Sequence, residues 1–134
     1  MHKNEFVEKM IGVPWVNRAH SFEAVDCYGL VLMYYKHVKG DEINIPDGYE
    51  AGDDKNGCYI NWTLASGFKE TKARGEGNII GMFKGERLAH VGVMIDAVNV
   101  LHCRGDLEKA GHVECHSLRS LSKFFTSVKI YTRE

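Results

Sequence analysis

Residues 26–40 decide the class of fold, and they read Asp26-Cys27-Tyr28-Gly29-Leu30-Val31-Leu32-Met33-Tyr34-Tyr35-Lys36-His37-Val38-Lys39-Gly40. From Leu30 onward, apolar side chains recur at i, i+1, i+4, i+5 and i+8, which is the spacing of an amphipathic helix. Asp26 has the short acceptor side chain of an N-cap, and Gly40 suits the end of a helix. The stretch therefore predicts a helix from Cys27 to about Lys39.

A shorter helix is predicted upstream. Apolar residues recur at helical spacing over residues 3–11, and Gly12 followed by Pro14 is a stop signal. We expect this helix to pack its apolar face on the core.

The segment downstream of Gly40 has weaker patterns. Residues 41–58 are rich in Asp, Gly and Asn and predict a long surface loop. Trp62, Leu64 and Phe68 favour a short helix, and the charged residues 69–77 are expected to be exposed.

The second half of the chain changes to short β-prone runs. Turns are expected at residues 84–85 and around Ala97, and a short helix is expected after Ser117. The predicted strands are residues 78–83, 90–95, 100–103 and 128–132. Helices followed by an antiparallel sheet are typical of an α+β domain.

Composition narrows the possible functions. The chain has 134 residues, 44% of them hydrophobic, so we expect one domain over residues 1–134. With 17 Lys and Arg against 18 Asp and Glu, the net charge of −1 offers no basic excess for nucleic acid. No apolar run approaches the roughly 20 residues of a membrane helix, and the N-terminus shows no secretion signal. We therefore expect neither nucleic-acid binding nor membrane insertion.

The predicted helix and strands carry a candidate nucleophile and two candidate histidines. Cys27 lies at the start of a helix, where unpaired backbone N–H groups favour a thiolate. In the strands, Val91, Val93 and Leu101 are core-facing odd positions, so His90 and His102 share the opposite face.

A mechanism follows from these roles. His90 would accept the Cys27 proton, and His102 would hydrogen-bond the other ring nitrogen of His90. The Cys27 N–H and a side chain in the turn at residues 12–17 are candidate donors to the oxyanion. Gly92 leaves space beside the His90 ring, which would suit a helix N-terminus or a substrate.

The same residues occur in blocks that resemble the NlpC/p-sixty family of cell-wall peptidases. Gly12-Val13-Pro14-Trp15 and Asp26-Cys27-Tyr28-Gly29-Leu30-Val31 resemble its first signature, a Gly-x-Pro-Tyr turn and then Asp-Cys-Ser-Gly-Leu-Val. Three further blocks resemble the second signature of the family, and they are Gly77-Asn78-Ile79-Ile80, His90-Val91-Gly92-Val93 and His102. The blocks keep the order of the family and extend over most of the chain.

This resemblance implies a papain-like NlpC-type fold with Cys27, His90 and His102 as the triad, and neither metal nor cofactor. The implied activity is endopeptidase cleavage of peptidoglycan stem peptides, at the γ-D-glutamyl-diaminopimelate bond. The N-terminal region and Val16-Asn17-Arg18 resemble the phage-tail branch of the family most. That branch implies a virion tail tip as the location after synthesis in the host cytoplasm, with other tail-tip proteins as partners.

The resemblance implies three residues at the substrate site, of which one matches the family and two depart from it. Asp26 matches an Asp that helps to hold the amine of the substrate, whereas Tyr28 stands where the family has Ser. Trp15 stands where a Tyr hydroxyl contributes to the oxyanion hole, and an indole N–H donates from a different position. Trp15, Asp26 and Tyr28 are therefore the predicted substrate or oxyanion residues.

Three other functions remain open at this stage. The fold can belong to a structural tail-tip protein with little activity, or to an amidase or acyltransferase. A metal site is the third, because soft and borderline ligands gather near the C-terminus, although their spacing matches no regular zinc pattern. These ligands are His102, Cys103, His112, Cys115 and His116. Three of the four cysteines, all except Cys27, are expected to be buried as small apolar residues.

Overall fold

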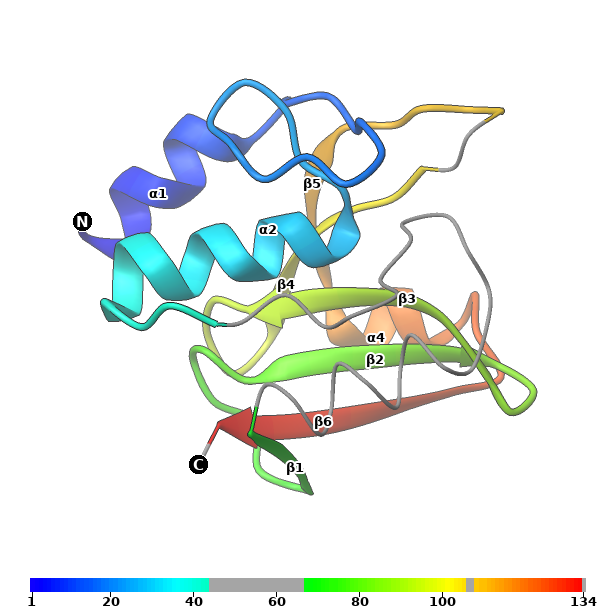
Figure 1. Ribbon diagram of the computed structural model, residues 1–134. Coiled ribbons are helices and arrows are strands. Elements are labelled where there is room, and N and C mark those ends of the chain that lie inside the picture. The colour runs from blue at the N-terminus through cyan, green and yellow to red at the C-terminus, as the bar shows by residue number, and fades with distance from the viewer. Residues whose placement is uncertain (44–66, 106–107, 134) are drawn as a thin grey trace.

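The computed structural model describes residues 1–43, 67–105 and 108–133 (Figure 1). Its helical elements are α1 (Lys3–Met10), α2 (Cys27–Tyr34), the π-helical turn η1 (Tyr35–Lys39) and α4 (Leu118–Ser122). Its strands are β1 (Phe68–Thr71), β2 (Ile79–Lys84), β3 (Arg87–Met94), β4 (Asn99–Cys103), β5 (Val113–Ser117) and β6 (Ser127–Arg133). The strands form one antiparallel sheet in the order β1-β6-β2-β3-β4-β5, so the predicted α+β class is confirmed. Among the described helices, none is both long and apolar enough to cross a membrane.

The helix predicted to begin at Cys27 is confirmed. The Asp26 carboxylate caps α2 by accepting a hydrogen bond from the Gly29 N–H at 2.6 Å. The last turn, η1, is wound as a π-helix and ends at Gly40, which adopts the left-handed φ of 66° that glycine tolerates best.

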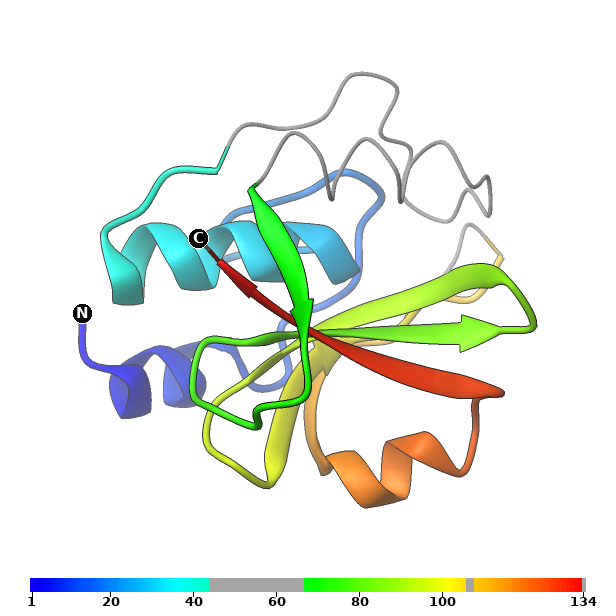
Figure 2. The same ribbon diagram turned by 90° about the horizontal axis from the view of Figure 1, so that it is seen from below.

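The three central strands, β2, β3 and β4, are largely buried on both faces. Odd-numbered side chains of β3 and β4, such as Val91 and Leu101, pack with α1 and α2. Even-numbered ones, Met94 and Val100, pack with Leu118 of α4. Figure 2 shows α2 and α4 on opposite sides of the sheet. Burial of both faces explains why the strands read as nearly continuous apolar runs.

The short helix predicted around Phe68 is wrong in the part of the chain that the structure describes. Phe68 begins strand β1, which pairs with β6. Its ring packs edge-on against Tyr35 at 5.5 Å between ring centroids, and the Arg133 guanidinium lies over it. This burial between η1 and β6 outweighs the weak helical pattern. Most of residues 69–77 are exposed, as expected, but Gly77 is buried. Trp62, Leu64 and nearly all of the predicted loop 41–58 lie outside the described residues.

The cysteine prediction is confirmed at one position and wrong at another. Cys103 is fully buried on the α2 face of the sheet. Cys115 is exposed, because β5 is an edge strand and the helices do not cover its full width. Cys58 lies outside the described residues.

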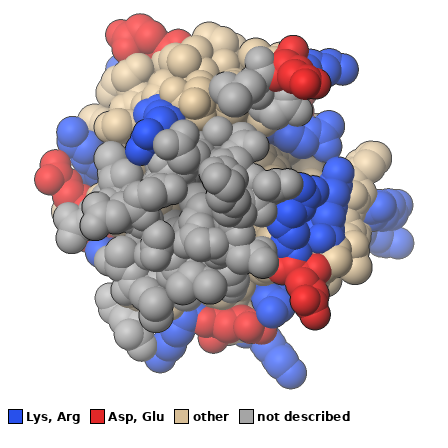
Figure 3. All heavy atoms as spheres, turned by 45° about the vertical axis from the view of Figure 1, so that its right-hand side comes forward, with Lys and Arg blue, Asp and Glu red and all other residues tan. Residues whose placement is uncertain are grey.

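Polar contacts tie the end of the long helix to the sheet. Glu76, just before β2, accepts hydrogen bonds from Tyr34 and Lys39. Arg133 of β6 forms a two-pronged ion pair with Asp41, with Nε to Oδ2 at 2.6 Å. On the surface drawn in Figure 3, Lys and Arg lie interspersed with Asp and Glu, in keeping with the net charge of −1.

Candidate active site

Cys27 is the first residue of α2 and is half-buried. The segment that leads to it is held by Asp26, which is fully buried. One Asp26 oxygen caps the helix and the other accepts a hydrogen bond from the Arg18 N–H at 2.6 Å. The thiol is therefore fixed at a helix N-terminus, where the helix dipole favours its anionic form.

The loop at residues 17–20 is pressed against the first turn of α2. The Asp26 N–H donates to the Ala19 carbonyl at 3.1 Å. A Cβ added at Gly29 would lie 1.9 Å from the same carbonyl oxygen, so only glycine fits at this point. Gly29 thus allows the loop to approach the helix that begins with Cys27.

The predicted pair of histidines is confirmed as a contact. His90 of β3 and His102 of β4 lie on one sheet face, and Nε2 of His90 is 3.0 Å from Nδ1 of His102. Both rings are almost completely buried. The contact engages Nε2 of His90, so Nδ1 is the ring nitrogen that the predicted mechanism assigns to Cys27.

Both histidines are held in the neutral state at neutral pH. Burial, followed by the charges of His102 and Arg104, lowers the pKa of His90 well below its usual range. Burial, followed by His116 and Arg104, lowers the pKa of His102 to about 4. A neutral imidazole has a free lone pair, so His90 has the protonation state that a general base needs.

A β-bulge lies directly before His90. In the β2–β3 ladder Met82 pairs with His90, but Phe83 pairs with Leu88, so Ala89 is the extra residue. Bulges bend a strand and re-aim its side chains, and they are frequent beside active sites. The His90 ring stacks on Phe125, with centroids 6.4 Å apart and planes inclined by 17°. Bulge and stacking together fix the direction of the His90 ring.

Gly92 faces His102 across the β3–β4 ladder. The prediction that it leaves open space beside the imidazole is wrong. A Cβ at this position would meet Val100 Cγ1 at 2.7 Å and His102 Cβ at 3.1 Å, so cross-strand neighbours fill the space. Gly92 therefore lets β4 approach closely and bring His102 to His90.

Cys27 and His90 lie toward the same end of the sheet. α2 packs across β3 and β4 (Figure 1). The Val25 carbonyl, two residues before Cys27, accepts a hydrogen bond from Sγ of Cys103 at 3.6 Å, at the end of β4. Because β3 and β4 are antiparallel and Gly92 pairs with His102, His90 also lies toward that end. Cys27 and His90 therefore lie toward one end of the sheet, and the catalytic roles of Cys27, His90 and His102 stay predictions.

The other predicted site residues are buried. Trp15 and Tyr28 belong to the core on the α2 side, with 5% and 3% of their surface exposed, and Asp26 is the helix cap described above. This burial leaves little of either aromatic ring for a substrate. Their roles in substrate or oxyanion binding stay predictions.

Of the five metal ligands considered from the sequence, His102 and His116 lie together, whereas the two cysteines point away from them. Cys103 follows His102 in a strand, so the two side chains point to opposite faces. Burial, followed by Asp26 and Glu114, raises the pKa of the Cys103 thiol to about 12. Cys115 and His116 likewise point apart in β5. His116, one of those candidate ligands, joins the histidine pair, because its Nδ1 lies 2.8 Å from Nε2 of His102.

The sequence prediction missed the strand that carries this neighbour. Residues 112–117 read His-Val-Glu-Cys-His-Ser, with polar side chains at the even positions. This period of two is the signal of a strand with one polar face. In the structure, β5 pairs with β4 so that Glu114 faces His102.

A helix that begins with cysteine and packs on an antiparallel sheet carrying a histidine pair defines a papain-like α+β class. Comparison of structures shows this fold in a known protein. The chain is similar to the NlpC/p60 domain of the peptidoglycan hydrolase SagA, with a TM-score of 0.61 and 16% sequence identity. The likeness covers 98% of this chain and 96% of that one. No protein-family model and no curated protein sequence matches the chain. The chain therefore has the papain-like NlpC fold.

Proposed function

We propose that the protein is a cell-wall hydrolase that cleaves peptidoglycan stem peptides by cysteine-peptidase chemistry. The observation that carries the proposal is the 3.0 Å contact between the buried rings of His90 and His102, at the end of the sheet where Cys27 begins its helix. The fold shared with a domain of a peptidoglycan hydrolase supports the choice of substrate.

In this mechanism the Cys27 sulfur attacks the carbonyl carbon of the scissile amide, and Nδ1 of His90 takes the thiol proton. The resulting imidazolium donates from Nε2 to His102, which holds the ring in place. His90 then gives the proton to the leaving amine, and a thioester remains on Cys27. Water, deprotonated by His90, hydrolyses the thioester and restores the thiol.

The oxyanion needs donors near the start of α2. We propose the Cys27 backbone N–H as one, since it lies at the positive end of the α2 dipole. We propose the Asn17 side chain as the second. Its buried Oδ1 has no hydrogen-bond partner among the described residues. Val16 donates to the Val25 carbonyl, which aligns residues 15–17 with the segment before Cys27. Rotation of the Asn17 amide by half a turn presents its NH₂ group instead.

The bond cleaved and the biological setting rest on the sequence resemblance. We propose the γ-D-glutamyl-diaminopimelate bond as the target. We also propose a phage tail tip as the setting, where other tail-tip proteins are neighbours and the wall is opened locally. Peptides of this chain in purified virions, and not only in host lysates, would support that setting.

Digestion of purified peptidoglycan tests the activity. Wild type and Cys27→Ala are compared, with products identified by mass spectrometry. Cys115→Ala is the matched control, because it removes an exposed thiol from the edge strand β5 and leaves Cys27, His90 and His102 in place. We expect stem-peptide fragments from wild type and Cys115→Ala and none from Cys27→Ala. If none of the three proteins releases fragments, the result would favour a structural protein with this fold. Transfer of the acyl group to an amine would favour an acyltransferase.

A further inference from the structure

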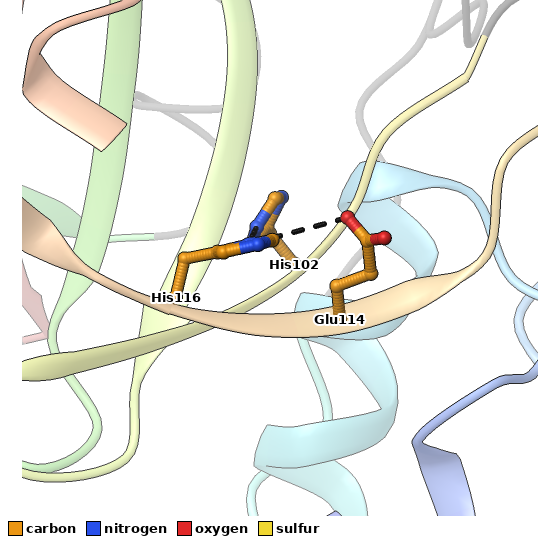
Figure 4. A group of neighbouring side chains, drawn as sticks. All are labelled: His102, Glu114 and His116. Atoms are coloured by element: carbon orange, nitrogen blue, oxygen red, sulfur yellow. Dashed lines mark hydrogen bonds and ion pairs between the residues drawn. The ribbon is translucent and has the colours of Figure 1, made fainter. Parts of the chain in front are cut away.

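Three potential metal ligands converge beside the candidate active site. His102 of β4 faces Glu114 of β5 across the ladder, and His116 lies two residues further along the same face. Figure 4 shows the three side chains pointing toward one another from the two strands. Nε2 of His102 is 2.8 Å from Nδ1 of His116, which is 4.0 Å from Oε2 of Glu114. All three ligand atoms lie within 4.8 Å of one another.

Two imidazole nitrogens and one carboxylate oxygen suit zinc and similar divalent cations. Tetrahedral zinc with bonds of about 2.0–2.1 Å holds its ligand atoms roughly 3.3 Å apart. The His102–His116 gap must therefore open by about 0.5 Å. The Glu114 oxygen must approach His116 by about 0.7 Å and His102 by up to about 1.5 Å, since the three atoms lie within 4.8 Å of one another. Rotation of side chains on an edge strand can supply these shifts, because His116 is 46% and Glu114 39% exposed. The exposed side also admits a cation and leaves room for water as a fourth ligand.

His112 supports the carboxylate from outside. Its Nε2 lies 3.3 Å from Oε1 of Glu114, the oxygen that does not face His116. Metal-binding carboxylates are commonly held in this way by a second partner, which orients the free oxygen toward the cation.

We propose that His102, Glu114 and His116 bind a zinc-type divalent cation, and that the bound cation inhibits the hydrolysis proposed above. The site itself stands on the geometry of β4 and β5. Its inhibitory effect rests on the proposed function, because it acts through the hydrogen bond between His102 and His90.

The inhibition follows from where the imidazole hydrogens must lie. For Nδ1 of His90 to accept the Cys27 proton, His90 carries its hydrogen on Nε2 and donates it to Nδ1 of His102. His102 then carries its own hydrogen on Nε2, which is the atom the cation needs. Binding shifts that hydrogen to Nδ1, and the bond to His90 reverses. His90 then accepts at Nε2 and carries its hydrogen on Nδ1, so it no longer accepts a proton from Cys27. Each ring keeps one hydrogen throughout.

Binding is tested without any reference to activity. Co(II) alone is titrated into the Cys27→Ala protein, so that the active-site thiol cannot bind it, and the visible absorption of the bound ion is followed. We expect one equivalent to bind, and an affinity at least about tenfold lower in Glu114→Gln and in His116→Gln, each made in the Cys27→Ala protein. His20→Gln, which removes an exposed histidine that lies outside β4 and β5, is the control and should bind as before. No absorption band, or an unchanged affinity in both variants, would overturn the site.

Inhibition is tested on proteins that retain Cys27. Each protein is assayed on peptidoglycan with and without Zn(II), and its own zinc-free rate is the reference. We expect Zn(II) to lower the wild-type rate at least about tenfold at concentrations that lower the Glu114→Gln rate less than twofold. Equal inhibition of both would overturn the inhibitory role and place the cation on Cys27. If zinc-free wild type cleaves nothing, the proposed function and the inhibitory role fail, and the Co(II) titration decides the site alone.

Discussion

Replacing Gly29 by alanine should destabilise the fold through a contact at the start of α2. The new Cβ would lie 1.9 Å from the Ala19 carbonyl oxygen and 3.0 Å from Oδ1 of Asp26. Both neighbours are held in place, since Ala19 accepts a hydrogen bond from the Asp26 N–H at 3.1 Å and Asp26 caps the helix. The loop must therefore move and release at least one of these bonds.

The magnitude follows from opposing contributions. Alanine favours a helix over glycine by about 1 kcal/mol. Against this, forced overpacking costs about 1–3 kcal/mol. A lost backbone hydrogen bond and a weakened N-cap cost about 1 kcal/mol each. We expect Gly29→Ala to lower the free energy of unfolding by about 2–4 kcal/mol, the difference between these contributions.

Urea unfolding followed by tryptophan fluorescence measures this difference. The matched control is Gly75→Ala, whose Cβ would meet only the Asn78 amide at an ordinary 3.6 Å and whose φ is not in the left-handed region. The control should unfold within about 0.5 kcal/mol of wild type. If Gly29→Ala also stays within about 0.5 kcal/mol of wild type, the loop does not lie against the helix as described.

Three further perturbations test other contacts. Gly92→Ala places a Cβ 2.7 Å from Val100 Cγ1 and 3.1 Å from His102 Cβ. Because this clash separates His90 from His102, the substitution should lower kcat at least about tenfold with KM nearly unchanged. An unchanged kcat would contradict a role for the histidine pair in catalysis. Asn17→Ala should lower kcat about 10²-fold as an oxyanion donor is lost, whereas a loss below about threefold would remove Asn17 from the mechanism. Burial raises the pKa of Glu76, but hydrogen bonds from Lys39 and Tyr34 outweigh burial and hold it below the ordinary 4.5. Wild type should therefore be more stable than Glu76→Gln above pH 4.5, with the difference disappearing as the pH falls through the lowered pKa. A difference in urea unfolding that is independent of pH would exclude this linkage.

The part of the site carried by regular elements was predictable from the sequence. The cap at Asp26 and the helical period placed Cys27 at a helix start, and the alternation of strand side chains placed His90 beside His102. Both rules are local, since they need only the spacing of neighbouring residues. The β-bulge at Ala89 and the stacking of Phe125 on His90 depend on contacts between segments that are distant in the sequence. The spacing of neighbouring residues therefore does not predict them.

The missed strand β5 shows why the chemistry at the sheet edge escaped prediction. Its core positions are Val113 and the exposed Cys115, so only one strongly apolar residue marks its buried face. Glu114 and His116 are polar and half open to solvent, which is typical of a loop as much as of an edge strand. The strand exists because it pairs with β4, and this pairing brings Glu114 and His116 to His102. The same edge position that makes the strand hard to recognise in the sequence leaves its polar side chains open to solvent beside the buried pair of His90 and His102.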